Sequence, residues 1–364
     1  MEEKEILIVG GGIAGTLLAW RLNQDGQSFR LFVGERDKAA SRVAAGVLNP
    51  VTGKRMVAGW RVEDQLEMAD RYYQAIGKEL GRDYYHSCSI RRYLLSRAEE
   101  KFLNQRLSDP RYRQFISPPL PSGAERTGIE DPLGSFRIAG AQVDLVRLID
   151  DLHAEWLEQG RLLVEPFDYG ALDPEGARPR YSGETVRAVV FCEGIGILEN
   201  PWFGKLPFRP VKGETLSLTG PGIRSNGDII HHRKWLLPLG PSQWRMGSTY
   251  DRGVARGEGS AELRSDAHQR LPRGRAELFE ALSGMVPHPE AFEIDDHRAG
   301  VRPATRDRLP YLGSHPRYPN FLVMNGLGSK GALLAPWLSE ILTGWLLRSQ
   351  PIPPEMSVQR HLVG

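Results

Sequence analysis

The opening of the chain carries the pattern that most limits its fold. Residues 5–26 read "EILIVGGGIAGTLLAWRLNQDG". The apolar residues at 6–9 predict a buried strand, the glycines predict a tight turn, and the residues that follow predict a helix that ends at Gly26. The next apolar segment, "FRLFV" at 29–33, predicts a second strand. Strand, turn, helix and strand in this order predict a Rossmann-like α/β unit.

The glycines of this turn have a spacing that predicts a ligand. Gly10, Gly12 and Gly15 follow the pattern G-x-G-x-x-G. The first glycine allows the tight turn, the second lets a pyrophosphate approach the backbone, and the third lets the helix pack closely on the strand. The N-terminus of the helix directs amide N–H groups toward the phosphates. We therefore predict a dinucleotide site; the alternative is a glycine-rich turn without a ligand.

The usual acidic residue of such a site is displaced in this sequence. A carboxylate at the end of the second strand normally accepts hydrogen bonds from the adenosine ribose, but that position is Val33. Glu35 follows after Gly34, which lets the backbone turn back, and we predict that Glu35 binds the ribose. Arg36 is typical of a site for a 2′-phosphate and leaves NADP as the alternative.

Length and composition limit the remaining possibilities. The 364 residues are enough for two domains, and 40% hydrophobic with 25% charged residues is ordinary for a globular protein. No segment is apolar enough for a membrane span, and the charged start leads directly into a strand, so we expect no secretion signal and a cytoplasmic location. Two cysteines provide neither a disulfide framework nor a thiolate metal site. A net charge of +2 argues against a dedicated nucleic-acid binder.

Later segments indicate that the chain returns to the nucleotide site. Small residues dominate "SRVAAGVLNP" at 41–50, which lets backbone lie against a flat ring system. "RAVVFCEGIG" at 187–196 predicts a late strand of the same sheet. "FLVMNGLGSKGALLAPWLSEILTGWLL", from Phe321, predicts another strand, glycine turn and helix. A chain that adds a second helix N-terminus at its end is building around a long ligand.

The remaining periodicity predicts a second domain. Residues 62–80 and 143–159 show helical periodicity, whereas 91–96 and 209–218 predict strands of a second, largely antiparallel sheet. Residues 117–125 and 252–262 predict loops. The fold class is therefore a two-domain α/β fold: a Rossmann-like domain and a mainly antiparallel-sheet substrate domain. The predicted cofactor domain comprises residues 1–62, 136–208 and 298–364, and the substrate domain comprises 63–135 and 209–297.

Seven segments, in this order along the chain, carry a family resemblance. They read "GGGIAG", "SRVAAGVLNP", "RPVKGETL", "IIHHRKWLLPL", "MGSTYD", "GVRPATRDRLPYLG" and "GLGSKGALLAP". Together they resemble the D-amino-acid oxidase, glycine oxidase and sarcosine oxidase family of FAD-dependent oxidoreductases over essentially the whole chain. The last two are also similar to the oxidase half of the bacterial bifunctional enzyme for tRNA 5-methylaminomethyl-2-thiouridine, whose methyltransferase half has no counterpart here.

The resemblance implies FAD as the cofactor. Because no cysteine lies near Lys330, the thioether of the sarcosine-oxidase-like members cannot form there, and we expect non-covalent FAD. Val164 corresponds to a position whose backbone contacts the adenine, although a core valine explains it equally well. The C-terminal glycine turn is expected beside the flavin pyrimidine, where a helix N-terminus stabilises negative charge. The predicted cofactor-binding residues are Gly10, Gly12, Ile13, Ala14, Gly15, Glu35, Ser41, Ala45, Gly46, Leu48, Val164, Gly194, Gly326, Gly328, Ser329, Lys330 and Gly331.

The resemblance also implies a substrate site. The arginine of "GVRPAT" is Arg302, which would bind a substrate carboxylate through the two donors of its guanidinium; the alternative is a structural ion pair with Asp307 or Glu293. Residues 229–239 are expected to form one strand with Arg233 and Trp235 on its inward face, although a surface arginine and a core tryptophan are equally good interpretations. The predicted catalytic residues are Arg302, Trp235 and Arg233, and no metal-ligand spacing occurs.

These expectations define a reaction class. The chain is predicted to oxidise the C–N bond of a small carboxylate-bearing amine or amino acid by hydride transfer to flavin N5, with O2 or an electron carrier as acceptor. One alternative is an oxidase for a carboxymethylaminomethyl-modified wobble uridine in tRNA. A flavin-dependent 2-hydroxyacid dehydrogenase and a non-catalytic flavin-binding module are the others. We expect no membrane partner, and the charge disfavours nucleic acid.

Overall fold

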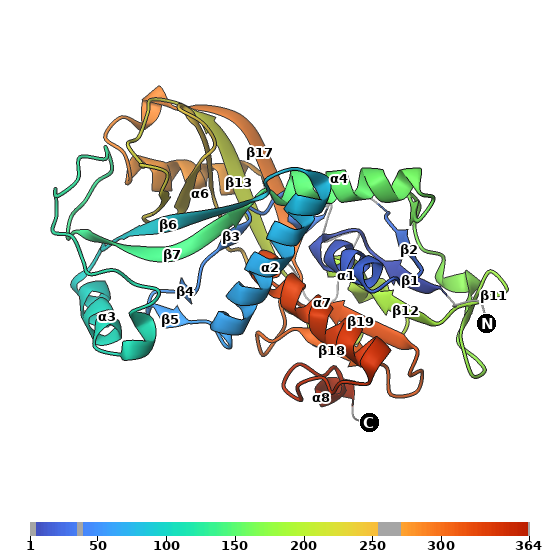
Figure 1. Ribbon diagram of the computed structural model, residues 1–364. Coiled ribbons are helices and arrows are strands. Elements are labelled where there is room, and N and C mark those ends of the chain that lie inside the picture. Colours follow the sequence, from blue (N-terminus) through green and yellow to red (C-terminus); the bar gives the residue numbers. More distant parts are fainter. Residues whose placement is uncertain (1–4, 35–38, 254–270, 363–364) are drawn as a thin grey trace.

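The computed structural model describes residues 5–34, 39–253 and 271–362. The described chain forms an elongated molecule with a β-sheet in each half (Figure 1). The N-terminal strands lie in one half, the long curved strands lie in the other, and α2 (Val62–Leu80) and α7 (Gly331–Arg348) lie between them. No helix in the described ranges is long and apolar enough to cross a membrane.

One sheet is built on the predicted N-terminal unit. Within the described residues its strand order is β18-β19-β12-β1-β2-β8, with all neighbours parallel except the pair β18 and β19. Its central strands are buried along their whole length, as expected when both faces of a parallel sheet are covered. The strands are β1 (Ile6–Val9), β2 (Phe29–Phe32), β8 (Leu162–Leu163), β12 (Ala188–Phe191), β18 (Tyr311–Ser314) and β19 (Phe321–Asn325).

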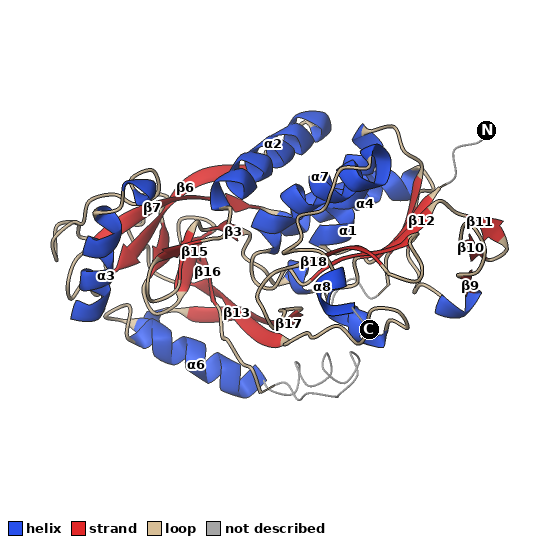
Figure 2. Ribbon diagram, turned by 90° about the horizontal axis from the view of Figure 1, so that it is seen from below, coloured by secondary structure: helices blue, strands red, loops and turns tan. Residues whose placement is uncertain are grey.

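Alternating side chains of β1 divide this half into two cores. Ile6 and Ile8 belong to the core under α1 (Ile13–Gln24), whereas Leu7 and Val9 belong to a core rich in aromatic residues on the opposite face. The helices α1, α7 and α4 (Leu145–Glu158) lie together on the first face (Figure 2). The sequence prediction of this strand–turn–helix–strand unit is confirmed.

The second sheet forms the other half. Its strand order is β17-β13-β16-β15-β14-β6-β7-β3 among the described residues, and all neighbours are antiparallel except β14 and β6. The two-domain α/β prediction is confirmed, with a mixed rather than purely antiparallel second sheet. The strands are β3 (Val47–Leu48), β6 (Tyr85–Tyr93), β7 (Ser135–Val143), β13 (Val211–Thr219), β14 (Ile229–His231), β15 (Trp235–Pro238), β16 (Gln243–Gly247) and β17 (Glu293–Arg302).

Smaller elements complete the fold. The helices α3 (Arg97–Leu107) and α6 (Leu271–Ser283) accompany the second sheet, and α8 (Gln359–Leu362) lies near the end of the chain. One short hairpin pairs β4 (Val51–Thr52) with β5 (Val57–Ala58). A small sheet contains β9 (Leu172–Asp173), β10 (Arg180–Tyr181) and β11 (Glu184–Thr185). The short 3-10 helices are η2 (Ala40–Arg42), η3 (Pro110–Tyr112), η4 (Tyr169–Ala171), η5 (Gly194–Glu199) and η6 (Pro289–Ala291).

The predicted helices and strands agree with the structure to different degrees. The helix predicted at 62–80 is confirmed as α2. The single strand predicted at 229–239 is wrong, because a tight turn at 232–234 divides it into the hairpin of β14 and β15. β7 hydrogen-bonds within the second sheet as far as Val143, so the predicted domain boundary at 136 lies inside a strand of that sheet. Most of the loop predicted at 252–262 lies outside the described residues.

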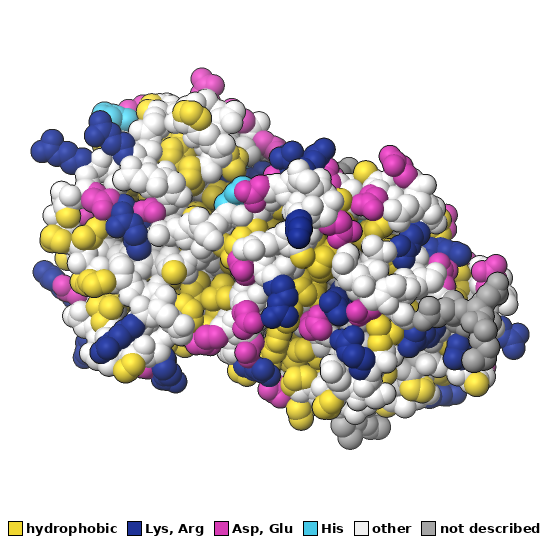
Figure 3. Space-filling model, viewed as in Figure 1, with side chains coloured by type: hydrophobic (Ala, Val, Ile, Leu, Met, Phe, Trp, Pro, Cys, Tyr) yellow, Lys and Arg dark blue, Asp and Glu magenta, His cyan; other side chains and the backbone are white. Residues whose placement is uncertain are grey.

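Charged groups on the surface are mixed in sign. On the face shown in Figure 3, basic and acidic side chains are interspersed over both halves of the molecule. This arrangement agrees with the net charge of +2. No large field of one sign covers that face, so it offers no continuous positive surface for a polyanion.

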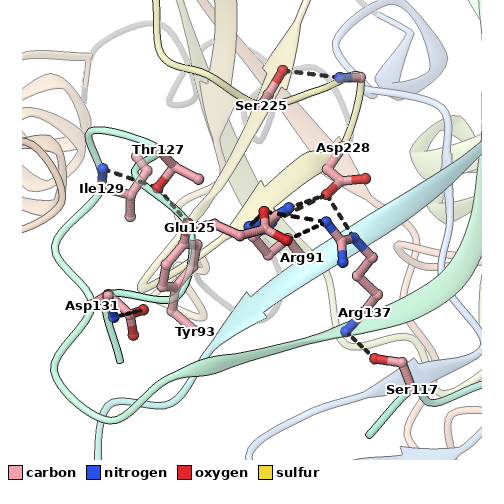
Figure 4. Close-up of polar contacts among 12 residues, drawn as sticks. Arg91, Tyr93, Ser117, Glu125, Thr127, Ile129, Asp131, Arg137, Ser225 and Asp228 are labelled. Carbon is pink, nitrogen blue, oxygen red and sulfur yellow. Dashed lines mark hydrogen bonds and ion pairs between the residues drawn. The ribbon is translucent and has the colours of Figure 1, made fainter. Parts of the chain in front are cut away.

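A buried ion cluster holds the outer part of the second sheet together. Arg91 of β6 is 1% exposed and pairs with Asp228 at 2.9 Å and with Glu125 (Figure 4). Arg137 of β7 also donates to Asp228 and to Glu125, at 3.1 and 3.0 Å. Two guanidinium groups thus share two carboxylates, which compensates the cost of burying the charges of Arg91 and Asp228. The cluster fixes the loop that contains Glu125 against both strands.

Candidate active site

A cavity of about 620 Å³ lies where the two sheets meet. Its walls come from the glycine turn after β1, the segment 39–47, the segment after β12, and the turn between β19 and α7. The second sheet supplies residues of β13, β15 and β17. Most of the wall segments from the first sheet follow the carboxyl ends of its parallel strands, where ligands bind in open α/β sheets. The cavity therefore extends from the nucleotide-type turn to the substrate-domain sheet.

Two glycines of the turn, Gly10 and Gly15, leave room only for backbone. A Cβ on Gly15 would stand 2.0 Å from the carbonyl oxygen of Gly10, and Gly10 itself has a φ of +108°. Gly12 differs, because its Cβ would meet only Ser41 Oγ, at 3.4 Å. Gly12 therefore faces open cavity, as expected for a backbone that a diphosphate approaches closely. The turn fits the diphosphate of a dinucleotide.

The N-terminus of α1 opens into the same space. Ser41 Oγ accepts a hydrogen bond from the amide of Ile13 at 3.0 Å, and Ile13 and Ala14 both line the cavity. The first amides of a helix have no partner within the helix and carry a partial positive charge, so they suit an anionic group. Gly15 lies behind this surface against Gly10 rather than in the cavity wall.

The segment after β2 runs along the cavity. Ser41, Ala45 and Gly46 line it, and Gly46 has a φ of +70° with Val143 O only 1.9 Å from where its Cβ would stand. A side chain at Gly46 would therefore collide with β7. Leu48 is fully buried in the core and does not line the cavity, so the structure places it behind the predicted site.

A second helix N-terminus closes the far end. The turn between β19 and α7 places Gly328, Ser329 and Gly331 in the cavity wall. Asn325 donates to the carbonyl oxygen of Gly194 at 2.9 Å, which ties this turn to the segment after β12. A Cβ on Gly331 would stand 3.1 Å from Ile13, so the starts of α7 and α1 meet. Two helix N-termini therefore converge on one cavity.

Two residues of this turn lie just outside the cavity wall. Gly326 has a φ of +81°, and its Cβ would stand 2.5 Å from Thr305. It allows the turn to pack against the segment that follows β17. Lys330 Nζ lies 3.3 Å from the position of a Cβ on Gly59, and burial lowers the pKa of this amine.

Arg302, at the end of β17, faces the cavity from the second sheet. Its Nη2 donates to Ser248 Oγ at 2.7 Å, and its guanidinium lies 3.4–3.5 Å from the carbonyl oxygens of Lys212 and Thr249. Burial lowers its pKa. A Cβ on Gly213 would stand 2.0 Å from Nη2, so the guanidinium lies directly against the backbone of β13.

The predicted structural partners of Arg302 are absent from its surroundings. Asp307 instead pairs with Arg360 at 2.9 Å and with His361 at 3.1 Å, and Glu293 lies at the opposite end of β17. No carboxylate in the described ranges pairs with Arg302. A guanidinium turned toward a cavity with neutral partners only is arranged to receive an anion.

Of the other two predicted substrate residues, Trp235 lies in the cavity wall and Arg233 does not. Trp235 lines the cavity, and its ring lies over Gly247, where a Cβ would stand 2.6 Å from Cζ2. Arg233 lies in the turn between β14 and β15, is exposed and does not line the cavity. The hairpin is the reason, because the turn rotates Arg233 away from the face that a continuous strand would have given it. The guanidinium of Arg233 instead lies beside Gly284, which follows α6. Its Cζ is 3.5 Å from the position that a Cβ on Gly284 would take.

The adenosine end of the predicted site is only partly described. Glu35 and Arg36 lie outside the described residues. Val33 is 3% exposed, and a Cβ on Gly11 would stand 2.5 Å from its side chain. Val164 follows β8, is 54% exposed and is not part of the cavity wall.

The cavity also contains residues that the sequence analysis did not single out. Gly213 and Ser248 hold the guanidinium of Arg302, and a glycine inside the strand "VKGETL" signals such a close approach. Glu193 and Gly194 follow β12 and line the nucleotide part, and only Gly194 was predicted. The carboxyl group of Glu193 receives hydrogen bonds from Tyr169 and, at 2.8 Å, from Asn200. An acidic residue directly after a buried strand was the available signal.

Glu193 predicts a pH-dependent stability. Burial raises the pKa of its carboxyl to about 7, against the hydrogen bonds from Tyr169 and Asn200, which lower it. The folded protein therefore holds a proton that the unfolded chain releases near pH 4.5. The unfolding free energy of FAD-free protein is expected to fall by up to about 3 kcal/mol as the pH rises through this window. Glu193→Gln should remove that component; parallel urea-unfolding profiles of both proteins from pH 5 to pH 8 would contradict it.

Comparison with known proteins agrees with this geometry. The model of the FAD dependent oxidoreductase family matches residues 5–345. Glycine oxidase of Bacillus licheniformis is 26% identical, over 96% of this chain and 95% of the relative. The tRNA 5-methylaminomethyl-2-thiouridine biosynthesis bifunctional protein of Azoarcus sp. (strain BH72) is 24% identical, over 97% of this chain but 58% of the relative.

Solved structures share the fold. Glycine oxidase from Geobacillus kaustophilus superimposes with a TM-score of 0.77 at 20% identity, over 99% of this chain and 100% of that one. Iminodiacetate oxidase from Chelativorans sp. BNC1 gives 0.74 at 21% identity, over 98% of each chain. The predicted family resemblance is confirmed, and the glycine turn, the small-residue segment and the paired helix N-termini fit FAD. The chain belongs to the family of FAD-dependent oxidoreductases that includes the amino-acid oxidases.

Proposed function

We propose that this enzyme oxidises the C–N bond of a small amine that carries a carboxylate. The observation that supports this most is the position of Arg302, which faces the cavity with neutral hydrogen-bond partners and no carboxylate partner in the described ranges. A desolvated guanidinium without a counterion costs free energy until an anion binds. A substrate carboxylate would provide the counterion and would be oriented by two charge-assisted hydrogen bonds.

The surrounding residues position the substrate. Ser248 and the carbonyl oxygens of Lys212 and Thr249 orient Arg302, and Trp235 provides an apolar wall that excludes water. FAD, when bound, supplies the hydride acceptor at its N5 atom. The chain's own contribution is then to hold the amine-bearing carbon at a fixed place relative to Arg302, so positioning accounts for much of the rate. We assign no catalytic role to Arg233.

We propose that FAD is bound without a covalent link. Cys192 is buried beneath the glycine turn, where a Cβ on Gly15 would stand 3.3 Å from its Cβ, and burial raises the pKa of its thiol. Cys88 lies on β6 and is not part of the cavity wall. Cys192 lines the cavity, but at the glycine turn, and the raised pKa of its thiol disfavours the thiolate that a covalent link to flavin would need. The cytoplasmic location and the choice between O2 and an electron carrier stay predictions.

Anaerobic mixing of the holoenzyme with matched compounds tests the proposed function. We expect glycine, sarcosine, proline or a D-amino acid to bleach the visible flavin absorption. The corresponding amines without a carboxylate should do so at least about 100-fold less efficiently, because two charge-assisted hydrogen bonds of roughly 1.5–3 kcal/mol each are lost. Bleaching by glycolate or lactate alone would contradict the proposal in favour of a hydroxyacid dehydrogenase. Bleaching only by tRNA with a carboxymethylaminomethyl uridine would contradict it in favour of the tRNA alternative.

A further inference from the structure

The nucleotide part of the cavity has an acidic group in an unexpected place. Among the described residues that line the cavity, only Glu193 and Glu199 are acidic, and both follow β12. The end of β2 offers Val33 instead, covered by Gly11. A carboxylate that could accept hydrogen bonds from a ribose is therefore present on the opposite side of β1 from its usual strand.

The structure fixes the position of Glu193 closely. Its Cα would lie 3.0 Å from a Cβ on Gly10, so the residue stands directly beside the first glycine of the phosphate turn. Tyr169 donates to Oε1, and Asn200 Nδ2 donates to Oε2 at 2.8 Å. When it is ionised, above its pKa of about 7, the carboxylate of Glu193 has about four acceptor sites, so these two bonds leave capacity for further donors from a ligand.

The chemistry of the surroundings indicates which part of the cofactor faces Glu193. A diphosphate bears acceptors and negative charge only, so the ionised carboxylate of Glu193 would be repelled by it. Ribose hydroxyls are donors that match the remaining acceptor capacity of Glu193. Pro166, Phe167 and Tyr169 line the same region and offer apolar and aromatic surface for an adenine ring.

We propose that Glu193, held by Tyr169 and Asn200, binds the adenosine ribose hydroxyls of FAD in place of an acid at the end of β2. This rests on FAD binding, which the family shows, and not on the proposed amine substrate. Its test therefore needs no turnover, and its failure would leave the role of Arg302 untouched.

Fluorescence titration of FAD-free protein tests the assignment. Two ligands are compared, FAD and an FAD analogue whose adenosine ribose lacks both hydroxyls. Wild-type protein is expected to bind the analogue about 10- to 100-fold more weakly than FAD, the loss that charge-assisted hydrogen bonds imply. Glu193→Gln should bind FAD about 10-fold more weakly than wild type and should discriminate little between the two ligands.

Further variants keep the test decisive. Glu158→Gln changes an exposed carboxylate at the end of α4, outside the cavity wall, and should behave as wild type. Glu193→Asp retains the charge but withdraws it by one methylene, and it should show intermediate discrimination between the two ligands. This variant replaces Glu193→Gln in the test if Glu193→Gln folds poorly. Equal discrimination by wild type, Glu193→Gln and Glu193→Asp would overturn the proposal. Loss of discrimination in Glu199→Gln or Glu35→Gln instead would overturn it in favour of that residue.

Discussion

Replacing Arg302 by lysine is expected to lower the efficiency of flavin reduction by about 10- to 100-fold while FAD content stays near that of the wild type. Lysine keeps the charge but loses the planar fork, so one of the two hydrogen bonds to a substrate carboxylate is lost, at roughly 1.5–3 kcal/mol. Arg302→Ala should cost more, because the carboxylate would then be desolvated without a partner. Rapid-mixing measurements of anaerobic flavin reduction provide the comparison.

The surroundings of Arg302 make this test specific. The guanidinium lies against Gly213 of β13 and donates to Ser248, so its hydrogen bonds are to the second sheet and not to the glycine turn or the α7 N-terminus that we assign to FAD. Arg306→Lys is a matched control, since Arg306 is exposed and lies just beyond β17. If both Arg302 variants lost FAD, while the holoenzyme that remained was reduced at the wild-type rate, Arg302 would be a structural residue.

Adding one methyl group at Gly12 is expected to weaken FAD binding by about 10- to 100-fold without unfolding the protein. Gly12 has an extended backbone with φ −76°, and its Cβ would meet only Ser41 Oγ at 3.4 Å. The methyl group therefore fits the protein but occupies the space that a diphosphate requires, an overpacking cost of roughly 1–3 kcal/mol. Gly15→Ala should lose FAD and stability together, because its Cβ would stand 2.0 Å from Gly10 O.

The contrast between these two glycines is measured by FAD titration and by thermal unfolding of the FAD-free proteins. Gly240→Ala, in a turn of the second sheet with 3.5 Å to the nearest atom, is the control for an added methyl group. Wild-type FAD affinity in Gly12→Ala would show that the diphosphate does not approach this turn. An unfolding temperature of Gly15→Ala equal to that of Gly12→Ala would contradict the close packing of the turn on itself.

The sequence by itself determined the elements whose causes are local. The G-x-G-x-x-G turn, its buried strand and its helix follow from backbone freedom at Gly10 and from hydrophobic periodicity, and all three occur as predicted. The amphipathic helix at 62–80 was predictable for the same reason. The family resemblance added the order of the remaining segments, and with it the importance of Arg302.

Only the tertiary structure decided which side chains meet across distant segments. The turn at 232–234 separates Arg233 from Trp235, although both stand in the one segment "IIHHRKWLLPL". Pairing with neighbouring strands, and not local propensity, sets where a strand ends. Arg360, far along the chain, pairs with Asp307, one of the two carboxylates that the sequence offered to Arg302. Strand order likewise brings Glu193 beside Gly10. Such contacts depend on sheet register between strands far apart in the sequence, and one residue of slip would turn each side chain to the other face.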